Sequence, residues 1–427
     1  PRKPRRPRRA PMGPLSFLRR LFSNGSVDAP VGHLVSLCQA LLAEPAEYAG
    51  AALARDTLAG YQQLDERNRE DFFEVLARGF SPEPEAVGRA ADAYRADPSA
   101  ANLVALQRTV EPARQELFRR LNMAPGGTAA LVEMRRVLLQ GIKDHPQWRA
   151  IDADLLHLLR SWFNRGFLRL ERIDWRTPAM VLEKIIQYEA VHAMQGWRDL
   201  RRRLEADRRC FAFFHPQLPD EPLIFIEVAL TRGMSATVQP LLDPRAPVAD
   251  TASADHAMFY SITNCQEGLR GISFGNLLIK QVAEELKREL PRLKHFATLS
   301  PIPGLRAWLE KQASMPFLDD PAWHLGEVAE DTRRTLKRLC AQYLLNAKQG
   351  DEPLDPVARF HLGNGASLDR INWMGDTSEQ GIARSAGMMV NYVYRLEDVE
   401  ENHDRYFRSH HVVASSAVQK LTREPGA

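Results

Sequence analysis

The sequence predicts an α+β protein in which an all-α half precedes an α/β half. Three observations support this fold class. Apolar residues recur at helical spacing nearly throughout residues 31–166. Beyond Gly166, short runs rich in aromatic and β-branched residues are typical of strands. Two of these runs enclose a glycine-containing loop and an amphipathic helix over 266–290, so the chain there reads strand, loop, helix and strand.

We divide the 427 residues into a tail, a helical domain and an α/β domain. Residues 1–30 form a basic tail that we expect to be disordered, residues 31–168 form the helical domain, and residues 169–427 form the α/β domain. Within the helical domain, Ser81 and Asp97 each precede a proline, a pattern that predicts two helix N-caps.

The predicted strands of the α/β domain belong to one sheet. They are 168–173, 210–214, 223–230, 258–263 and 296–300, with a last strand at 388–395. The predicted helices of this domain follow Thr177 and Pro178, cover the apolar stripe of 274–290, and span 331–348.

Composition excludes several classes of protein. No apolar run approaches the ~18 residues that span a bilayer, so we expect no membrane partner. Four widely spaced cysteines without a CxxC pair indicate a reducing compartment. The first twenty residues hold eight of the 57 basic residues, which leaves 49 against 54 acidic ones and argues against an extended nucleic-acid surface. The tail itself is compatible with a disordered end, a binding arm or a targeting segment.

The loop QEGLRGISFGN at 266–276 lies between a predicted strand and a predicted helix. Its glycines would let backbone N–H groups and the positive end of the helix approach an anion such as a pyrophosphate. Its spacing matches neither GxGxxG nor GxxxxGK[ST]. Gln266, Gly268 and Gly271 instead fall approximately on a pattern that resembles the coenzyme A loop of GNAT acyltransferases. A purely structural role for the glycines is the alternative.

Ser300 ends a predicted strand and stands before two prolines in SPIPG. Pro301 and Pro303 restrict the residues that precede them to extended backbone, so Ser300 is held in one pose. Ligands of α/β sheets sit at such strand ends. We therefore predict that Ser300 is a positioned functional hydroxyl.

His361 lies among small and amide residues in PVARFHLGNGASLDRINWMGD, at a predicted helix-to-loop junction. From the residues alone it is either a structural histidine or a catalyst. The chain has no HExxH, no His/Cys cluster and no carboxylate pair, so we expect no metal site. The residues by themselves indicate a coenzyme A or nucleotide binder with a positioned serine.

Four longer stretches together resemble the malonyl-CoA decarboxylase family. They are MFYSITNCQEGLRGISFGNLLIKQVAEEL, TLSPIPGLRAWL, FHLGNGASLDRINWMGD and GMMVNYVYR. The resemblance implies a helical oligomerisation domain and a GNAT-like catalytic domain with a mixed, mainly antiparallel sheet. It also implies conversion of malonyl-CoA to acetyl-CoA and carbon dioxide without a metal or an organic cofactor, since coenzyme A is part of the substrate.

The resemblance further implies roles for individual residues. Ser300 matches the family's catalytic serine, His361 its catalytic histidine and Tyr394 an active-site tyrosine. The coenzyme A segment corresponds to Arg270, Gly271, Ile272, Ser273, Phe274, Gly275 and Asn276. Other members can carry a glutamate where this chain has Ser273, so we treat Ser273 as a phosphate-loop residue only.

Decarboxylation would leave an electron pair on the α-carbon, delocalised into the thioester as an enolate. The site must stabilise that charge and deliver a proton to carbon. We expect His361 to donate the proton, because an unperturbed histidine pKa near ~6.5 lies close to neutral pH. Ser300 would be its polar partner and proton acceptor, and Tyr394 would hold one of them in place.

Two alternatives stay open at this point. A GNAT-type acyltransferase would need an amine acceptor, and a non-catalytic acyl-CoA sensor or nucleic-acid-associated regulator would use the basic tail as a binding arm. For a decarboxylase we expect malonyl-CoA and acetyl-CoA as ligands, a homodimer or homotetramer, and no nucleic-acid partner. We expect a bacterial cytoplasmic location, with the mitochondrial matrix as the alternative.

Overall fold

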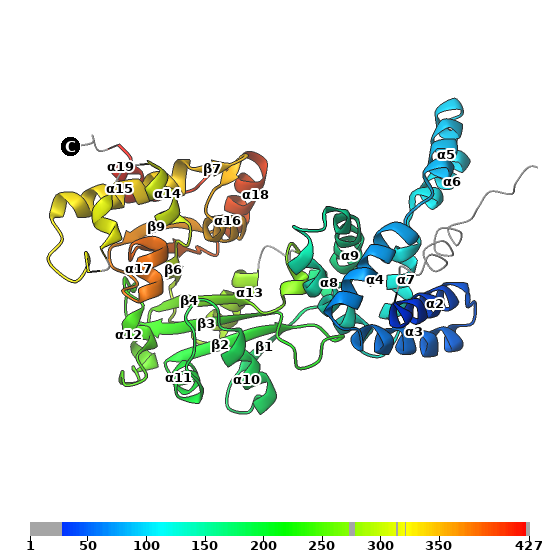
Figure 1. Ribbon diagram of the computed structural model, residues 1–427. Helices are drawn as coiled ribbons and strands as arrows, with labels where there is room; N and C mark the ends of the chain where they lie inside the picture. Colours follow the sequence, from blue (N-terminus) through cyan, green and yellow to red (C-terminus); the bar gives the residue numbers. More distant parts are fainter. Residues whose placement is uncertain (1–27, 273–277, 313–314, 321, 424–427) are drawn as a thin grey trace, which may run out of the picture. The chain divides into compact units, whose positions relative to one another are not determined.

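The computed structural model describes residues 28–272, 278–312, 315–320 and 322–423 (Figure 1). The chain divides into two compact units. The first contains the chain up to Asn164 together with Pro216–Leu218 and Gln266–Ile272. The second contains Arg165–His215, Pro219–Cys265 and Ser273–Ala427. The division at Asn164 lies close to the predicted boundary, but two short segments from the second half of the sequence join the helices.

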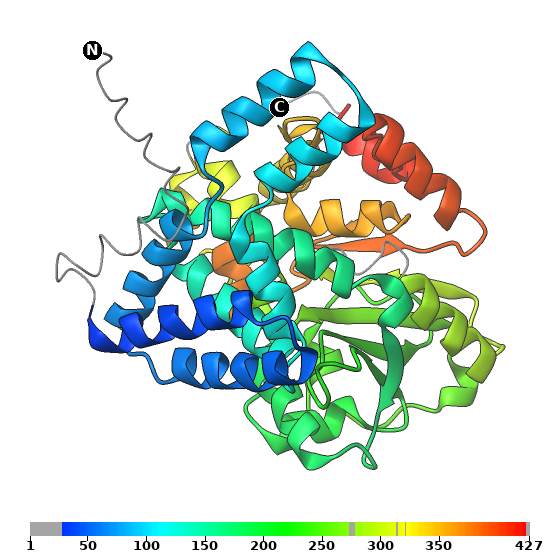
Figure 2. The ribbon, with the colours of Figure 1, turned by 90° about the vertical axis from the view of Figure 1, so that its right-hand side faces the viewer.

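The first unit is built from helices. They are α2 (Ala29–Ala43), α3 (Glu47–Gln62), α4 (Glu66–Gly79), α5 (Pro84–Ala96), α6 (Ala100–Val110), α7 (Ala113–Asn122), α8 (Gly127–Gly141), η1 (Pro146–Trp148) and α9 (Arg149–Trp162), with η4 (Glu267–Leu269) from the later segment. The dark blue helices α2 and α3 lie side by side (Figure 2). Apolar residues at helical spacing, such as Leu34, Leu117 and Leu155, are fully buried and form the core of this unit.

Two helix starts differ from their prediction. Glu83 caps α5 and Ser99 caps α6, and each side chain accepts a free N–H of the first helical turn. The predicted caps, Ser81 and Asp97, were wrong by two residues. The hydroxyl of Ser81 instead accepts from Arg114 at 2.6 Å, and Asp97 ends α5. The prolines did mark helix boundaries. The capping side chains, however, belong to the residues that follow Pro82 and Pro98.

A buried arginine ties the segment 266–272 to α8. The guanidinium of Arg135 donates to the carbonyls of Gly268 at 2.7 Å and Arg270 at 2.8 Å, and it pairs with Asp152 on α9 at 2.8 Å. Arg135 is only 2% exposed, and a buried charge is tolerated only when it is paired and hydrogen-bonded. A Cβ atom on Gly268 would lie 2.0 Å from the carbonyl oxygen of Val132, so the two backbones touch directly.

The second unit is built on an eight-stranded sheet in the order β1-β2-β3-β4-β5-β10-β6, with β9 paired to β10. Its strands are β1 (Arg169–Ile173), β2 (Arg208–Phe214), β3 (Ile224–Thr231), β4 (His256–Asn264), β5 (His295–Thr298), β6 (Ser300–Pro301), β9 (Ser367–Asn372) and β10 (Met389–Val393), while β7 (Lys348–Gln349) and β8 (Glu352–Pro353) form a separate pair. All pairs are antiparallel except β4 with β5. The predicted mixed, mainly antiparallel sheet is confirmed, and β9 is a strand that the sequence analysis missed.

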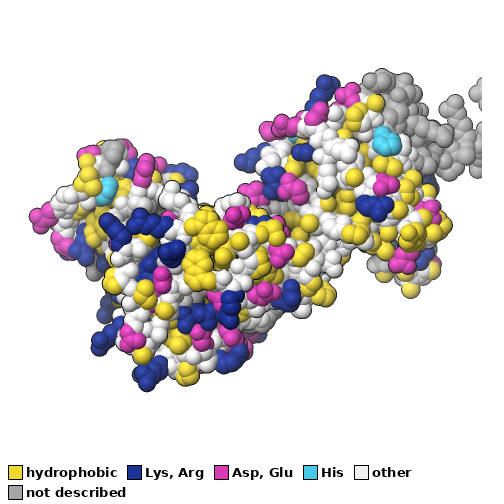
Figure 3. Space-filling view, turned by 90° about the horizontal axis from the view of Figure 1, so that it is seen from below, with side chains coloured by type: hydrophobic (Ala, Val, Ile, Leu, Met, Phe, Trp, Pro, Cys, Tyr) yellow, Lys and Arg dark blue, Asp and Glu magenta, His cyan; other side chains and the backbone are white. Residues whose placement is uncertain are grey.

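Helices connect and cover these strands. They are α10 (Ala179–Tyr188), α11 (Trp197–Arg203), α12 (Gln239–Leu242), α13 (Leu278–Glu289), α14 (Leu305–Gln312), α15 (Glu330–Asn346), α16 (Pro356–Gly363), α17 (Glu379–Ser385), α18 (Val399–Ser409) and α19 (Ser416–Leu421), with short turns η2 (Arg165–Phe167), η3 (Thr251–Ser253) and η5 (Pro316–Asp319). Because β4 and β5 are parallel, their connection must cross over, and α13 provides that crossover. Among the described helices, none combines the length and apolar character needed to cross a membrane. On the faces shown in Figure 3, basic side chains are interspersed with acidic and apolar ones.

Strand β4 continues beyond the end of its parallel pairing with β5. Their parallel pairing ends at Phe259 and Thr298. Directly after Phe259, β4 carries a bulge at Tyr260 in its pairing with β3, and a bulge bends its strand. Beyond this point β4 stays with β3, whereas the other strand passes into β6, where Ser300 pairs with β10. This divergence opens the space in which the candidate site lies.

Replacing Gly268 by alanine should lower the free energy of unfolding of the helical unit by about 1–3 kcal/mol, because the added methyl group would overlap backbone that cannot yield. Gly50 is the matched control, since a Cβ there meets nothing within 4 Å. Gly50→Ala lies inside α3 and should leave stability unchanged or slightly higher. Thermal unfolding of both variants tests this, and equal melting temperatures would contradict the close approach of α8 and residue 268.

Candidate active site

A pocket of about 210 Å³ lies where β4 and β5 separate. Its walls come from β4 after Phe259, from the β5–β6 junction and from α16, and Val191 closes one side. Ser300 and His361 both line this pocket, and they are only 5% and 3% exposed. The pocket therefore gives a ligand access to these two largely buried side chains.

Ser300 stands at the break between β5 and β6. In β6 it lies opposite Val390 of β10. Pro301 follows it and lacks an N–H group, which is tolerated because β6 is the last strand in the sheet order. The hydroxyl of Ser300 donates to Oγ1 of Thr298 at 2.9 Å. The serine is thus held by its backbone pairing and by a hydrogen bond from its side chain.

Helix α16 brings His361 to Ser300. The helix begins at Pro356, and the side chain of Asp355 caps it by accepting the N–H of Ala358 at 2.9 Å. His361 lies in the last turn, where its Nε2 is 2.9 Å from Oγ of Ser300. Its ring stacks on Tyr392 with centroids 4.6 Å apart. The imidazole is therefore fixed both at its face and at its nitrogens.

Tyr394 completes a hydrogen-bonded row. It follows β10, and its N–H donates to the carbonyl of Phe296 at 2.8 Å. Its hydroxyl lies 2.8 Å from Nδ1 of His361, on the opposite side of the ring from Ser300. The structure thus brings together the three residues that the sequence analysis singled out. Their catalytic roles stay predictions.

Burial sets the protonation of this row. Desolvation lowers the pKa of His361 from its ordinary value of 6.5 to about 3. Desolvation also raises the pKa of Tyr394 well above its ordinary value. At neutral pH the imidazole is therefore neutral and the phenol protonated. The unperturbed histidine pKa that the sequence analysis relied on therefore does not apply to His361, because the side chain is buried without a carboxylate beside it.

Comparison with known proteins identifies the family to which this chain belongs. A family model described as the malonyl-CoA decarboxylase C-terminal domain matches residues 166–427, and the model of the N-terminal domain matches residues 80–163. The chain belongs to the malonyl-CoA decarboxylase family. The α/β domain and the preceding helical region expected from the resemblance are confirmed.

Individual members of the malonyl-CoA decarboxylase family are similar over most of their length. The mitochondrial enzyme of the goose Anser anser anser is 40% identical over 346 residues, which cover 72% of this chain and 69% of the relative. The rat enzyme is 36% identical over 359 residues, which cover 75% of this chain and 73% of the relative. Solved structures of malonyl-CoA decarboxylases from Rhodopseudomonas palustris and Agrobacterium vitis are 50% and 47% identical, with TM-scores of 0.88 and 0.86, and cover 91% of this chain and 99% of theirs.

The structure describes only the first part of the predicted coenzyme A segment, Arg270–Asn276. Its first three residues, Arg270, Gly271 and Ile272, belong to the helical unit, whereas Ser300, His361 and Tyr394 belong to the other unit. Gly271 has a φ of 82°, which glycine adopts without strain, and its carbonyl accepts from Arg160 at 3.3 Å. The remaining residues, Ser273, Phe274, Gly275 and Asn276, lie outside the described residues. The phosphate-binding role of the segment stays a prediction.

Metal ligation finds no support among the described residues. Within those parts of the chain, no group of three or more His, Cys, Asp or Glu side chains is placed to hold a metal ion. The four cysteines are buried free thiols. Burial raises the pKa of Cys38 to about 12, so this side chain stays a thiol at neutral pH. The predicted independence from cofactors stays a prediction.

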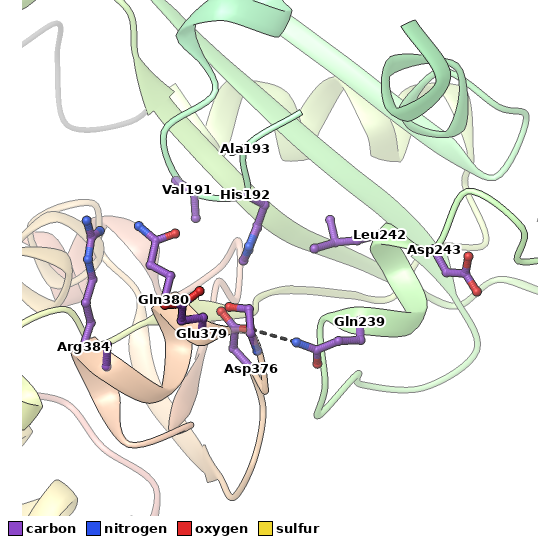
Figure 4. Close-up of a pocket in the computed structure, with 12 residues that line it drawn as sticks. Val191, His192, Ala193, Gln239, Leu242, Asp243, Asp376, Glu379, Gln380 and Arg384 are labelled. Atoms are coloured by element: carbon purple, nitrogen blue, oxygen red, sulfur yellow. Dashed lines mark hydrogen bonds between the residues drawn. The ribbon is translucent and has the colours of Figure 1, made fainter. Parts of the chain in front are cut away.

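A larger pocket of about 710 Å³ lies in the same unit and contains none of the predicted site residues. Figure 4 shows the ring of His192 directed toward Asp376, which accepts from Gln239 at 2.8 Å. The two pockets share Val191. We assign the candidate active site to the smaller pocket, because it unites a hydroxyl and an imidazole within hydrogen-bond distance.

Sequence reasoning missed Thr298, which contacts Ser300; Tyr392, which stacks on His361; and Asn391, whose side chain donates to the carbonyl of Thr298. A signal was available for two of them. Side chains two residues apart on a strand point to the same face, so Thr298 accompanies Ser300 and Tyr392 accompanies Tyr394. Asn391 has no such signal, because its contacts depend on how β9 and β10 pair.

Replacing His361 by glutamine should change how stability depends on pH. Below pH ~6.5 the unfolded wild type binds a proton at this histidine that the folded state rejects, so wild-type stability falls as pH falls toward 3. As pH falls through that range, the free energy of unfolding of wild type should therefore decrease relative to that of His361→Gln by about 1.4 kcal/mol per pH unit. Urea unfolding at a series of pH values measures it. Parallel curves for the two proteins would show that the imidazole is not held neutral.

Proposed function

We propose that this protein decarboxylates malonyl-CoA to acetyl-CoA and carbon dioxide. Membership of the malonyl-CoA decarboxylase family supports the reaction, as do relatives of that name at 36–50% identity. The observation that carries the proposal for the site is the 2.9 Å contact between Ser300 and His361 in a buried pocket. The reaction needs a proton donor screened from water, and this pair supplies one.

The reaction is balanced by one proton from solvent. The bond between the carboxylate carbon and the α-carbon breaks, and its electron pair moves into the thioester to give an enolate. Carbon dioxide leaves without charge. The α-carbon then takes a proton, and no bond to sulfur is broken. Each turnover therefore consumes one malonyl-CoA and one proton and releases acetyl-CoA and carbon dioxide.

In this proposal His361 gives its Nε2 proton to the α-carbon, which leaves the ring as an imidazolate, and Ser300 is the polar partner that accepts a hydrogen bond from Nε2 before the transfer. The buried phenol of Tyr394 stays protonated and orients the ring through Nδ1. A solvent proton restores the imidazole after each turnover. A neutral imidazole is suited to this task because the enolate carbon is far more basic than the heteroatoms of the site, so a charged acid is not required.

The surroundings favour the developing enolate. Hydrogen bonds are stronger in a dry pocket than in water, and one donor aimed at a developing oxyanion contributes roughly 3–4 kcal/mol in comparable sites. A fixed serine loses little conformational entropy when the substrate arrives. We propose that the reaction needs no metal or organic cofactor and that the segment Arg270–Asn276 holds the phosphates of coenzyme A.

The cellular location is proposed from the relatives alone. These relatives include mitochondrial and bacterial malonyl-CoA decarboxylases. We propose the bacterial cytoplasm, with the mitochondrial matrix as the other setting in which the same reaction would run.

Variants of the site test the proposal directly. Purified protein supplied with malonyl-CoA, but without metal, biotin or ATP, should form acetyl-CoA and carbon dioxide in equal amounts. Ser300→Ala and His361→Asn should each lower kcat by ~10²–10⁴-fold, as expected for the loss of a positioned acid–base group. Tyr394→Phe should lower kcat by about tenfold, because it removes one hydrogen bond to the ring.

The matched control is His157→Asn, which changes an exposed histidine on α9 and should leave kcat unchanged. Undiminished turnover in the Ser300 and His361 variants would leave the reaction but refute the residues. A folded wild type that binds coenzyme A without turnover would refute the reaction, and acetyl transfer to an amine would then mark an acyltransferase.

We also propose that the protein is a homo-oligomer formed through α5 and α6. These helices pack on each other, yet neither contains a buried residue. Figure 1 shows the pair projecting beyond α4 and α7 of the same unit. Leu103, Val104 and Val110 are 38–44% exposed along α6. A helical hairpin without a core of its own gains stability when a second copy covers its apolar side.

Val104→Glu should therefore reduce the molar mass in solution to that of a smaller assembly, because a charge would be buried at the interface. Val248→Glu is the control, since Val248 is 48% exposed in the other unit. Light scattering after gel filtration measures the masses. A monomeric wild type, or an unchanged mass for Val104→Glu, would refute the hairpin as the interface.

A further inference from the structure

Thr298 occupies an irregular position in the sheet beside Ser300. The pairings of Val393 with Ala297 and of Val390 with Ser300 set a register in which Tyr392 lies opposite Thr298. A regular ladder would join the N–H of Tyr392 to the carbonyl of Thr298. Here that N–H donates to Oγ1 of Thr298 at 3.1 Å instead. The side chain of Thr298 thus replaces its own carbonyl in the ladder.

Asn391 fixes this irregularity. Its Nδ2 donates to the displaced carbonyl of Thr298 at 2.7 Å and to the carbonyl of Ser235 at 3.1 Å. Its Oδ1 accepts from Nε of Arg370 at 3.0 Å and from Asn372 at 2.7 Å. Because an arginine nitrogen can only donate, the amide of Asn391 has a single orientation. Asn391 is fully buried, so water does not compete for these bonds.

The donors and acceptors of the row then follow one after another. Thr298 accepts from the N–H of Tyr392 and from the hydroxyl of Ser300. Ser300 has only one proton, so toward His361 its oxygen can only accept, and Nε2 must carry a hydrogen. A neutral imidazole has one N–H, which leaves Nδ1 as an acceptor for the hydroxyl of Tyr394.

We propose that Thr298 is a positioning residue that fixes the direction of the hydrogen bonds through Ser300 and His361. All protons in the row point from Tyr394 toward Thr298. A nucleophilic serine needs the reverse order, in which serine donates to histidine and a carboxylate accepts from the other ring nitrogen. Thr298 therefore keeps His361 in the tautomer that presents a proton at Nε2 and keeps Ser300 from being activated as a nucleophile.

The tautomer of His361 is the first measurement. Full-length protein labelled with ¹⁵N in its 12 histidines would be studied by NMR, with His361 assigned by its absence from His361→Asn. Wild type should show a protonated Nε2 and an unprotonated Nδ1. Thr298→Val keeps the side-chain shape but removes the acceptor, so the hydroxyl of Ser300 should turn to Nε2 and the proton should move to Nδ1. Thr298→Ser keeps the oxygen and should match wild type.

Kinetics give an independent readout, which rests on the proposed decarboxylase function. Thr298→Val should lower kcat by ~10²-fold with little change in KM, and Thr298→Ser should stay within a few-fold of wild type. A general loss of structure would not be restored by a serine at this position. Equal kcat values for wild type and Thr298→Val would overturn the proposal.

The wild-type spectrum decides the matter even when Thr298→Val fails to fold. A wild-type His361 protonated at Nδ1 would overturn the proposal. The spectrum needs no turnover, so an inactive wild type with protonated Nε2 would refute the proposed function and leave the role of Thr298 intact. An active wild type with protonated Nδ1 would support the proposed function and refute the role of Thr298.

Discussion

The burial of one neutral imidazole at the point where β4 and β5 separate is the constraint on which the site depends. Desolvation lowers the pKa of His361 to about 3, and the surroundings of the ring offer a hydroxyl at each nitrogen instead of a carboxylate. A ring in this setting is neutral before the reaction, and it can donate a hydrogen bond or a proton from Nε2. Every other feature of the site either creates this environment or fixes the ring within it.

The sheet creates that environment by breaking its own regularity twice. The bulge at Tyr260 directs β4 away from its parallel neighbour, and Thr298 interrupts the ladder that should have carried β5 smoothly into β6. Tyr260 lines the pocket, and Thr298 contacts Ser300, which also lines it. The compensating bonds, from Asn391 and from the hydroxyl of Thr298, leave the affected backbone groups paired, so the opening does not leave them unsatisfied.

The sequence predicted what depends on local pattern. Helical spacing located the first unit, alternating and β-branched runs located most strands, and the prolines after Ser300 marked a fixed hydroxyl. It could not predict the neutral state of His361, because a pKa depends on burial that residues far apart in sequence create. It also missed β9 and the interlocked amide of Asn391, whose partners are determined by strand register. The resemblance to a family paired Ser300 with His361, and only the structure gave the 2.9 Å between them.

The central claim is that the row delivers a proton to carbon and that Ser300 does not attack the thioester. The most direct test is to let the protein turn over malonyl-CoA in deuterated water and to weigh the products by mass spectrometry. The account predicts acetyl-CoA with one deuterium in its methyl group, an equal amount of carbon dioxide and no free coenzyme A from the reaction. Free coenzyme A together with malonate, or an acyl group found on Ser300, would contradict it.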